Sequence, residues 1–209
     1  FYTMKKTISI LAAICIAVTM LTPVYAESTA VSEVLANVKQ RIPDTSEYTE
    51  FNSNVSEYDN GTYYNFSWST EDGNKSMEVR CTSDGVITSY SYDDSESDDY
   101  GDKFNAPGYD EAYEKAVSLC DALNPGMSDR IRVEKRNTVE RLYDGDFSFS
   151  LKRYENNIPV ENSWGNVSIS MDCSKINHYY MDYNSLEFEK SDKLIDKEAA
   201  SKAFAEKIG

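Results

Sequence analysis

The sequence predicts an α+β fold in which two tandem units follow a signal peptide, and each unit packs one helix on a four-stranded antiparallel meander sheet. Three observations lead to this prediction. Turn dipeptides recur at a constant spacing, an order of one helix and then several strands occurs twice, and a short apolar run stands near the N-terminus.

The composition is that of a globular protein with an acidic surface. The chain has 209 residues and a formal net charge of −15, because 36 Asp and Glu stand against 21 Lys and Arg. Its 16 Tyr and 8 Phe supply apolar area for a core, which excludes a disordered acidic tail. Nucleic-acid binding is not expected, since affinity for the phosphate backbone rests on Lys and Arg that displace counterions.

The first 26 residues have the three parts of a secretory signal peptide. Lys5 and Lys6 form the basic start, residues 8–21 are apolar, and Ala26 is the small residue expected before cleavage. The apolar run is shorter than the ~20 residues that a membrane-spanning helix needs. Residues 1–3 precede the first Met and are interpreted as untrimmed upstream sequence. We therefore expect an exported protein, secreted or on the cell surface, with no membrane contact after cleavage.

The first unit is predicted over residues 27–93. Apolar residues recur at helical spacing between Val31 and Ile42, and Pro43 closes this run. Three hairpin dipeptides follow at intervals of twelve residues, and they predict four antiparallel strands because Asn, Asp and Gly tolerate positive φ. Apolar and polar residues alternate between the turns, which predicts a sheet with one buried face. The dipeptides are Asn60-Gly61, Asp72-Gly73 and Asp84-Gly85.

The second unit is predicted over residues 109–190. An apolar helical stripe from Ala112 to Leu123 ends before a Pro-Gly pair, and alternating strands come after it. Two turn dipeptides stand 84 residues after their counterparts in the first unit. They are Asp144-Gly145 and Asn156-Asn157.

Two further segments complete the predicted organisation. Residues 94–108 form an acidic linker between the units. Residues 191–209 have the pattern of another helix, which we interpret as the start of a third unit that continues beyond the chain. The alternative is a terminal helix that packs back on the second sheet.

Few residues point to catalysis. His178 is the only histidine, so every Ser or Cys nucleophile would depend on it, and its place in a predicted strand favours a surface role. Cys81, Cys120 and Cys173 lie in apolar patterns typical of buried structural thiols, while a disulfide or a reactive thiol is the alternative. No zinc spacing, phosphate loop or dinucleotide fingerprint occurs. We predict no catalytic residue, no metal and no cofactor.

Two surface features are candidates for binding. The acidic run from Asp93 to Asp99 offers oxygen ligands for calcium, but it lacks the ligand spacing of a calcium loop, which favours a solvated charge run. Five tyrosines crowd the last strand of each predicted sheet, where they either cover the core or anchor a partner, and packing is the favoured role. They are Tyr90, Tyr92, Tyr179, Tyr180 and Tyr183.

Three strand segments of the second unit carry a family resemblance. They are Phe149-Ser150-Leu151-Lys152-Arg153-Tyr154, Asn157-Ile158-Pro159-Val160 and Val167-Ser168-Ile169-Ser170-Met171-Asp172. Together they resemble the YcdB/YcdC repeat family, which is similar to PepSY domains and to propeptides of thermolysin-like metalloproteases. The resemblance implies PepSY-like helix-on-sheet units in secreted or cell-envelope proteins of Gram-positive bacteria, some with modules that attach to the cell wall.

From these features we expect a non-catalytic interaction or regulatory module that binds peptides or modulates a secreted peptidase. A strand edge can pair with an extended peptide, and proline cannot donate to a central ladder, so Ile158, Pro159 and Val160 are the candidate peptide-binding edge. The resemblance implies one alternative, an inhibitory or chaperone propeptide whose metallopeptidase domain lies beyond the chain. A hydrolase with paired carboxylates is a third class, which predicts two facing acids in a deep cleft.

Overall fold

The computed structural model describes residues 30–95, 106–136, 146–184, 201–202 and 205–206. The expected signal peptide, most of the acidic linker and most of segment 191–209 lie outside these residues, although residues 201–202 and 205–206 are helical. Within the described part, no helix combines the length and the apolar character needed to cross a membrane.

The described chain begins with a helix over residues 30–39, and a second helix, α2 (Tyr109–Leu123), separates the fourth strand from the fifth. The strands are β1 (Glu50–Tyr58), β2 (Gly61–Ser69), β3 (Lys75–Thr82), β4 (Ile87–Asp94), β5 (Ile131–Glu134), β6 (Asp146–Glu155), β7 (Ile158–Ser170) and β8 (Ile176–Met181).

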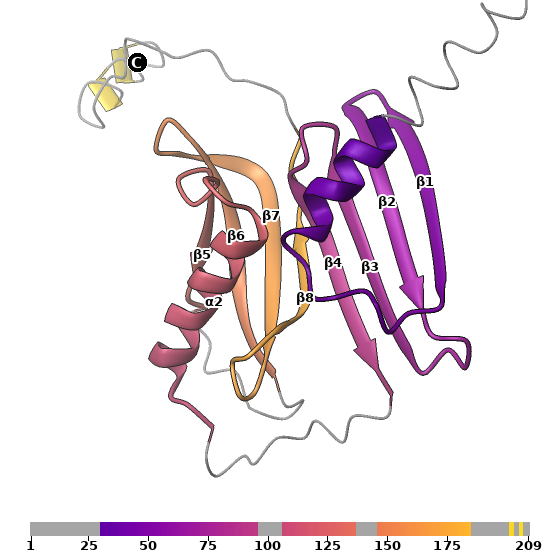
Figure 1. The fold of residues 1–209 in the computed structure, drawn as a ribbon. Coiled ribbons are helices and arrows are strands. Elements are labelled where there is room, and N and C mark those ends of the chain that lie inside the picture. Colours follow the sequence, from indigo (N-terminus) through magenta and orange to yellow (C-terminus); the bar gives the residue numbers. More distant parts are fainter. Residues whose placement is uncertain (1–29, 96–105, 137–145, 185–200, 203–204, 207–209) are drawn as a thin grey trace, which may run out of the picture.

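All eight strands belong to one antiparallel sheet with the order β1-β2-β3-β4-β8-β7-β6-β5 (Figure 1). The prediction of tandem PepSY-like units, each with its own four-stranded sheet, is therefore wrong. β4 pairs with β8, and Tyr90 stands opposite Tyr179 at the centre of this pairing. Two separate sheets would leave both strands with unpaired backbone groups, whereas the joined sheet satisfies them and buries both tyrosines. In the described residues up to 184, the result is a mostly β fold with two short helices.

Hairpin turns lie at or beside the predicted dipeptides. β1 and β2 pair as far as Tyr58 opposite Gly61, so their loop is Asp59-Asn60, one residue before the predicted position. Asn156-Asn157 joins β6 to β7 with φ values of 52° and 64°, the positive values that a type I′ turn needs. Asp144-Gly145 lies outside the described residues. Local turn chemistry therefore accounts for the tight β1–β2 and β6–β7 connections.

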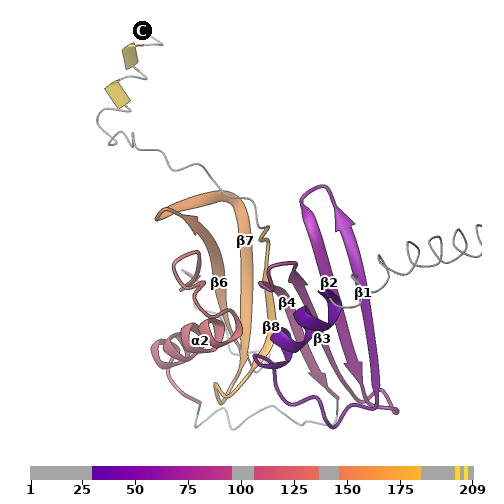
Figure 2. The ribbon, with the colours of Figure 1, turned by 45° about the horizontal axis from the view of Figure 1, so that its top comes forward.

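Both helices cover the same face of the sheet, with residues 30–39 over the β1–β4 half and α2 over β5 and β6 (Figures 1 and 2). Alternate strand residues on that face are buried, among them Phe66, Val79 and Phe149. α2 contributes a stripe of small and apolar residues: Ala112, Ala116, Cys120 and Leu123. The core is thus a single layer between the sheet and its helices, and no described element covers the opposite face.

A buried polar contact holds the two halves together. The Ile87 N–H donates to Asn124 Oδ1 at 2.8 Å, and Asn124 Nδ2 donates to the Ile87 carbonyl at 2.9 Å and to the Tyr179 hydroxyl oxygen at 3.2 Å. Arg41, just after the first helix, donates to the Leu123 carbonyl at 3.2 Å. The end of α2 is therefore bonded to the first half of the sheet, while the helix itself packs on β5 and β6.

Candidate functional site

The uncovered face of the sheet is lined mainly by small polar side chains. They occupy the strand positions that alternate with the core residues and therefore point away from the helices. Ser and Asn are too short to bury much apolar area, so this face offers hydrogen-bond donors and acceptors and forms no second core. The small residues on it include Asn52, Asn54, Ser56, Asn65, Ser67, Ser89, Ser91, Asn166 and Ser168.

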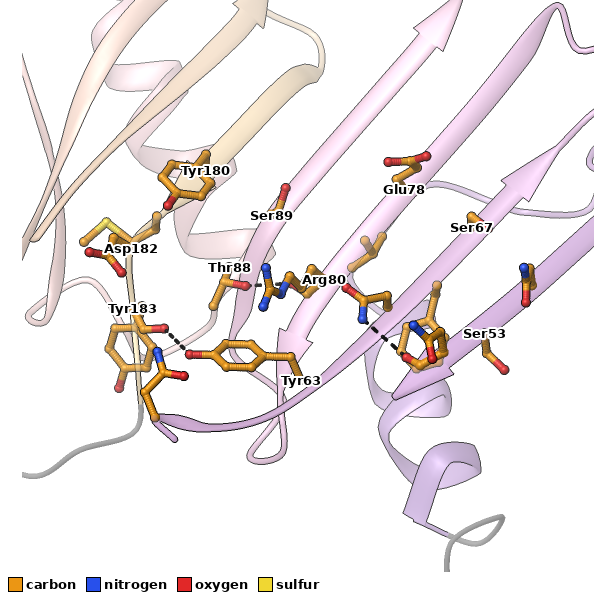
Figure 3. Close-up of a pocket in the computed structure, with 17 residues that line it drawn as sticks. Ser53, Tyr63, Ser67, Glu78, Arg80, Thr88, Ser89, Tyr180, Asp182 and Tyr183 are labelled. Carbon is orange, nitrogen blue, oxygen red and sulfur yellow. Dashed lines mark hydrogen bonds between the residues drawn. The ribbon is translucent and has the colours of Figure 1, made fainter. Parts of the chain in front are cut away.

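A hollow of about 470 Å³ opens on this face over β1 to β4 and the end of β8 (Figure 3). Its volume lies in the range of sites that take small molecules or a few residues of a peptide. Five of the small residues just described line it: Asn52, Asn54, Asn65, Ser67 and Ser89. The larger polar groups of the lining are Tyr63, Glu78, Arg80, Tyr180, Asp182 and Tyr183.

The Arg80 guanidinium is the positive group of this hollow. Its Cζ lies 4.4 Å from the ring centroid of Tyr63 and 5.3 Å from that of Tyr58, within the range of cation–π contacts. Its Nε is buried and has no hydrogen-bond partner. The other arginines of the described residues each donate a hydrogen bond to an oxygen of the chain: Arg41, Arg130, Arg132, Arg136 and Arg153. Among the arginines of the described residues, only the Arg80 guanidinium donates no hydrogen bond to the chain.

A local irregularity of the sheet positions Arg80. It stands opposite Asn65 of β2 and Ser89 of β4, while the next residue, Cys81, stands opposite Ile87. Thr88 is therefore an extra residue in β4, and its hydroxyl donates to the Arg80 carbonyl at 3.3 Å. Such bulges redirect side chains near binding sites.

Tyr63 forms a fixed wall of the hollow. The residue is 5% exposed, and its hydroxyl donates to the Tyr183 carbonyl at 3.3 Å. Burial raises the pKa of Tyr63, and the positive charge of Arg80 offsets only part of this rise. The hydroxyl therefore stays protonated at neutral pH and contributes no negative charge beside Arg80.

Two carboxylates share the hollow with Arg80. Glu78 lies two residues earlier in β3, which places its Cα roughly 7 Å from that of Arg80 on the same face. Asp182 follows β8 and lines the other side. Within the described residues neither acid forms an ion pair with Arg80, so the hollow presents separate positive and negative groups.

A second hollow of about 700 Å³ lies further along the same face, over β5 to β7. Trp164, which is 63% exposed, lines it, and Tyr180 lines the first hollow. The ring centroids of Trp164 and Tyr180 are 5.4 Å apart, so this aromatic pair separates the two hollows. The polar face thus extends across both halves of the sheet.

The predicted peptide-binding edge, residues 158–160, opens β7. Ile158 stands opposite Glu155 and Pro159 opposite Tyr154 of β6, and the sheet order places β7 between β6 and β8. β8 pairs with β7 only from Gly165 onward, so among the described strands none borders the other side of residues 158–162. Peptide binding there stays a prediction.

The structure assigns most of the other candidates to packing. Tyr90, Tyr179 and Tyr183 are buried, whereas Tyr180 is exposed and borders the hollow. All three described cysteines are free and buried. His178 is exposed, with its Nδ1 3.5 Å from Asn166 Nδ2. Asp93 and Asp94 belong to β4, and the remaining acids of the predicted calcium run lie outside the described residues.

Sequence reasoning did not identify Arg80 or the ring of Tyr63. One signal was present, since Arg80 stands between Val79 and Cys81 and therefore faces away from the core. The pairing of Arg80 with Tyr58 and Tyr63 depends on strand register, which a local pattern does not report.

Comparisons with known proteins concern the fold. No family model and no curated protein matches the chain. Among solved structures, the chain is similar to the Bacillus megaterium YpeB C-terminal domain, with a TM-score of 0.52 and 11% sequence identity. The match covers 82% of this chain and 71% of that chain. At this identity the similarity extends to the arrangement of strands and helices and to nothing finer.

Proposed function

We propose that this chain is a non-catalytic interaction module of an exported protein and that it binds peptides on the uncovered face of its sheet. One observation carries the proposal: the polar hollow contains an arginine whose donors have no acceptor in the described chain. Short amides and hydroxyls around it can bond to peptide N–H and C=O groups. The fold similarity to the YpeB domain, together with the sequence resemblance, supports a PepSY-like relationship, which is part of this proposal.

The state of the cysteines favours binding over thiol chemistry. Burial raises the pKa of Cys81 and of Cys120 to about 12 in each case. A thiol acts as a nucleophile only as its thiolate, which is scarce at neutral pH when the pKa is so high. These thiols therefore contribute to the core and supply no reactive group to the face that we propose for peptides.

A second candidate function is that of an inhibitory or chaperone propeptide for a secreted metallopeptidase. β1 favours it, because β1 pairs with β2 along all nine of its residues and no other strand of the described residues pairs with its outer edge. An extended segment of a peptidase could add to this edge through backbone hydrogen bonds.

Two measurements on the purified chain test these proposals. A random peptide library is displayed against the immobilised protein, and we expect enrichment of peptides that compete with one another in solution. Lack of enrichment over a blank surface would exclude peptide binding as the function.

In parallel, inhibition of a thermolysin-type peptidase is titrated, and rapid cleavage of the chain without inhibition rules out the propeptide role. Export predicts a mature N-terminus at Glu27, which protein sequencing of secreted material checks.

A further inference from the structure

We propose that Arg80, stacked against Tyr58 and Tyr63, binds a carboxylate of the peptide ligand, and that Glu78 and Asp182 receive a basic group beside it. The inference rests on the proposed function, because it names the chemistry by which the same hollow would select its peptide. The site is assembled from three strands, since Tyr58 ends β1, Tyr63 belongs to β2 and Arg80 to β3.

The guanidinium is held in place before any ligand arrives. Ring contacts at 4.4 Å and 5.3 Å restrict the flexible side chain, so less entropy is lost when it binds. The Arg80 Nε–H is buried and has no acceptor, so it has lost its hydrogen bond to water without forming one to the protein. The two terminal nitrogens, Nη1 and Nη2, are therefore the donors left for a ligand, and the planar fork they form matches a carboxylate with two parallel hydrogen bonds.

Charge in the hollow favours a carboxylate over a more highly charged anion. Glu78 and Asp182 line the same hollow, and the whole chain carries a net charge of −15. A phosphate with nearly two charges, or a polymer that repeats its negative charge, is repelled by these acids more strongly than a single carboxylate is. If the ligand also carries an ammonium or guanidinium group next to its carboxylate, Glu78 and Asp182 attract that group as its ion-pair partners. A peptide that places a basic residue near a carboxylate meets both conditions.

The carboxylate has two sources in a peptide, the C-terminus and an acidic side chain. Three short probes distinguish them: acetyl-Ala-Lys-Ala-Ala as the free acid, the same peptide as the C-terminal amide, and acetyl-Ala-Lys-Asp-Ala as the amide. Each is titrated into the isotope-labelled full chain, with NMR detection of the Arg80 Nε–H and of the backbone amides of Tyr63 and Ser89. NMR detects millimolar binding, so a weak fragment is sufficient.

Two arginine variants provide a matched comparison. Arg80→Gln removes the charge from the hollow. Arg132→Gln removes an arginine that also stacks on a tyrosine, Tyr154 at 4.1 Å, but that donates to Asn157 of the same chain. We expect Arg80→Gln to weaken binding of a carboxylate probe by about tenfold or more, and Arg132→Gln to leave it unchanged. Melting curves establish that both variants fold.

The outcomes separate this inference from the proposed function. Arg80-dependent binding of a probe that bears a carboxylate, with the amide that lacks a carboxylate at least about tenfold weaker, supports the inference and identifies the source of the carboxylate. If all three peptides bind equally well, or if binding survives Arg80→Gln, the role of Arg80 is overturned while peptide binding stands. If no peptide shifts any resonance, the inference and the proposed peptide binding fail together.

If an oligogalacturonate binds in their place with dependence on Arg80, the ligand is an acidic sugar and the peptide assignment is overturned. The comparison of free acid and amide needs no variant, so it decides the question even if Arg80→Gln does not fold.

Discussion

Replacing Asn124 by alanine tests whether the buried joint between the two halves stabilises the protein. β4 pairs with β8 from Ser89 to Ser91, and Ile87 lies just before the point where this pairing begins. The Asn124 amide takes the place of the missing strand there, accepting from the Ile87 N–H and donating to its carbonyl. Asn124 is 3% exposed and Ile87 is fully buried, so water does not readily replace these bonds.

The expected loss follows from the two backbone groups left without a partner. A buried donor or acceptor without a partner costs about 1–3 kcal/mol. With two such groups at Ile87, Asn124→Ala should lower the free energy of unfolding by about 4 kcal/mol. In a domain of this size that loss corresponds to a decrease of about 8–16 °C in the melting temperature. The lost bond to the Tyr179 hydroxyl adds to the effect, because this ring is 1% exposed.

Urea unfolding measures this loss, with the fluorescence of the buried Trp68 as the signal. Asn65→Ala is the matched control, since the Asn65 amide makes only long bonds of 3.3 and 3.4 Å on the uncovered face, and we expect a change within about 0.5 kcal/mol. A loss below about 1 kcal/mol for Asn124→Ala, with an unchanged denaturant slope, would refute the view that this amide completes the pairing of β4.

Three further predictions concern the sheet, its charges and its thiols. A Cβ at Gly165 would lie 2.2 Å from the Tyr180 carbonyl oxygen, so Gly165→Ala should cost about 3 kcal/mol or more and increase hydrogen exchange along β7 and β8; unchanged exchange argues against a tight approach there. Burial pushes the pKa of Glu155 up, but bonds from two arginines outweigh it and leave the pKa below the ordinary 4.5. The associated stability is therefore present above pH 4.5 and is lost as the pH falls through the folded-state pKa, so Glu155→Gln should flatten the decline in denaturation midpoint below that pH, and a parallel decline contradicts the assignment. Because burial raises the pKa of Cys81 and of Cys120, Ellman's reagent at pH 8 should label the folded chain far more slowly than the urea-unfolded chain, and equal rates would show that the thiols are accessible.

The residues of the proposed binding face could be anticipated only in part. The alternation of Val79 and Cys81 with polar neighbours predicts a face of the sheet that points away from the core. It does not show that Tyr58 and Tyr63 meet Arg80, because that contact depends on how three strands register. Tyr180 was one of five equivalent tyrosines in the sequence, and its exposure follows from its side of β8.

The sequence by itself determined the hairpins and the side of each strand that faces the core. Positive φ at Asn156 and Asn157 and a period of two along a strand are properties of a few neighbouring residues. The tertiary structure decided that β4 and β8 join, which turned two expected sheets into one and created a polar face that extends over both halves. No local pattern encodes this pairing, because it brings together edges far apart in the chain and forms to satisfy backbone groups that would otherwise stay unpaired.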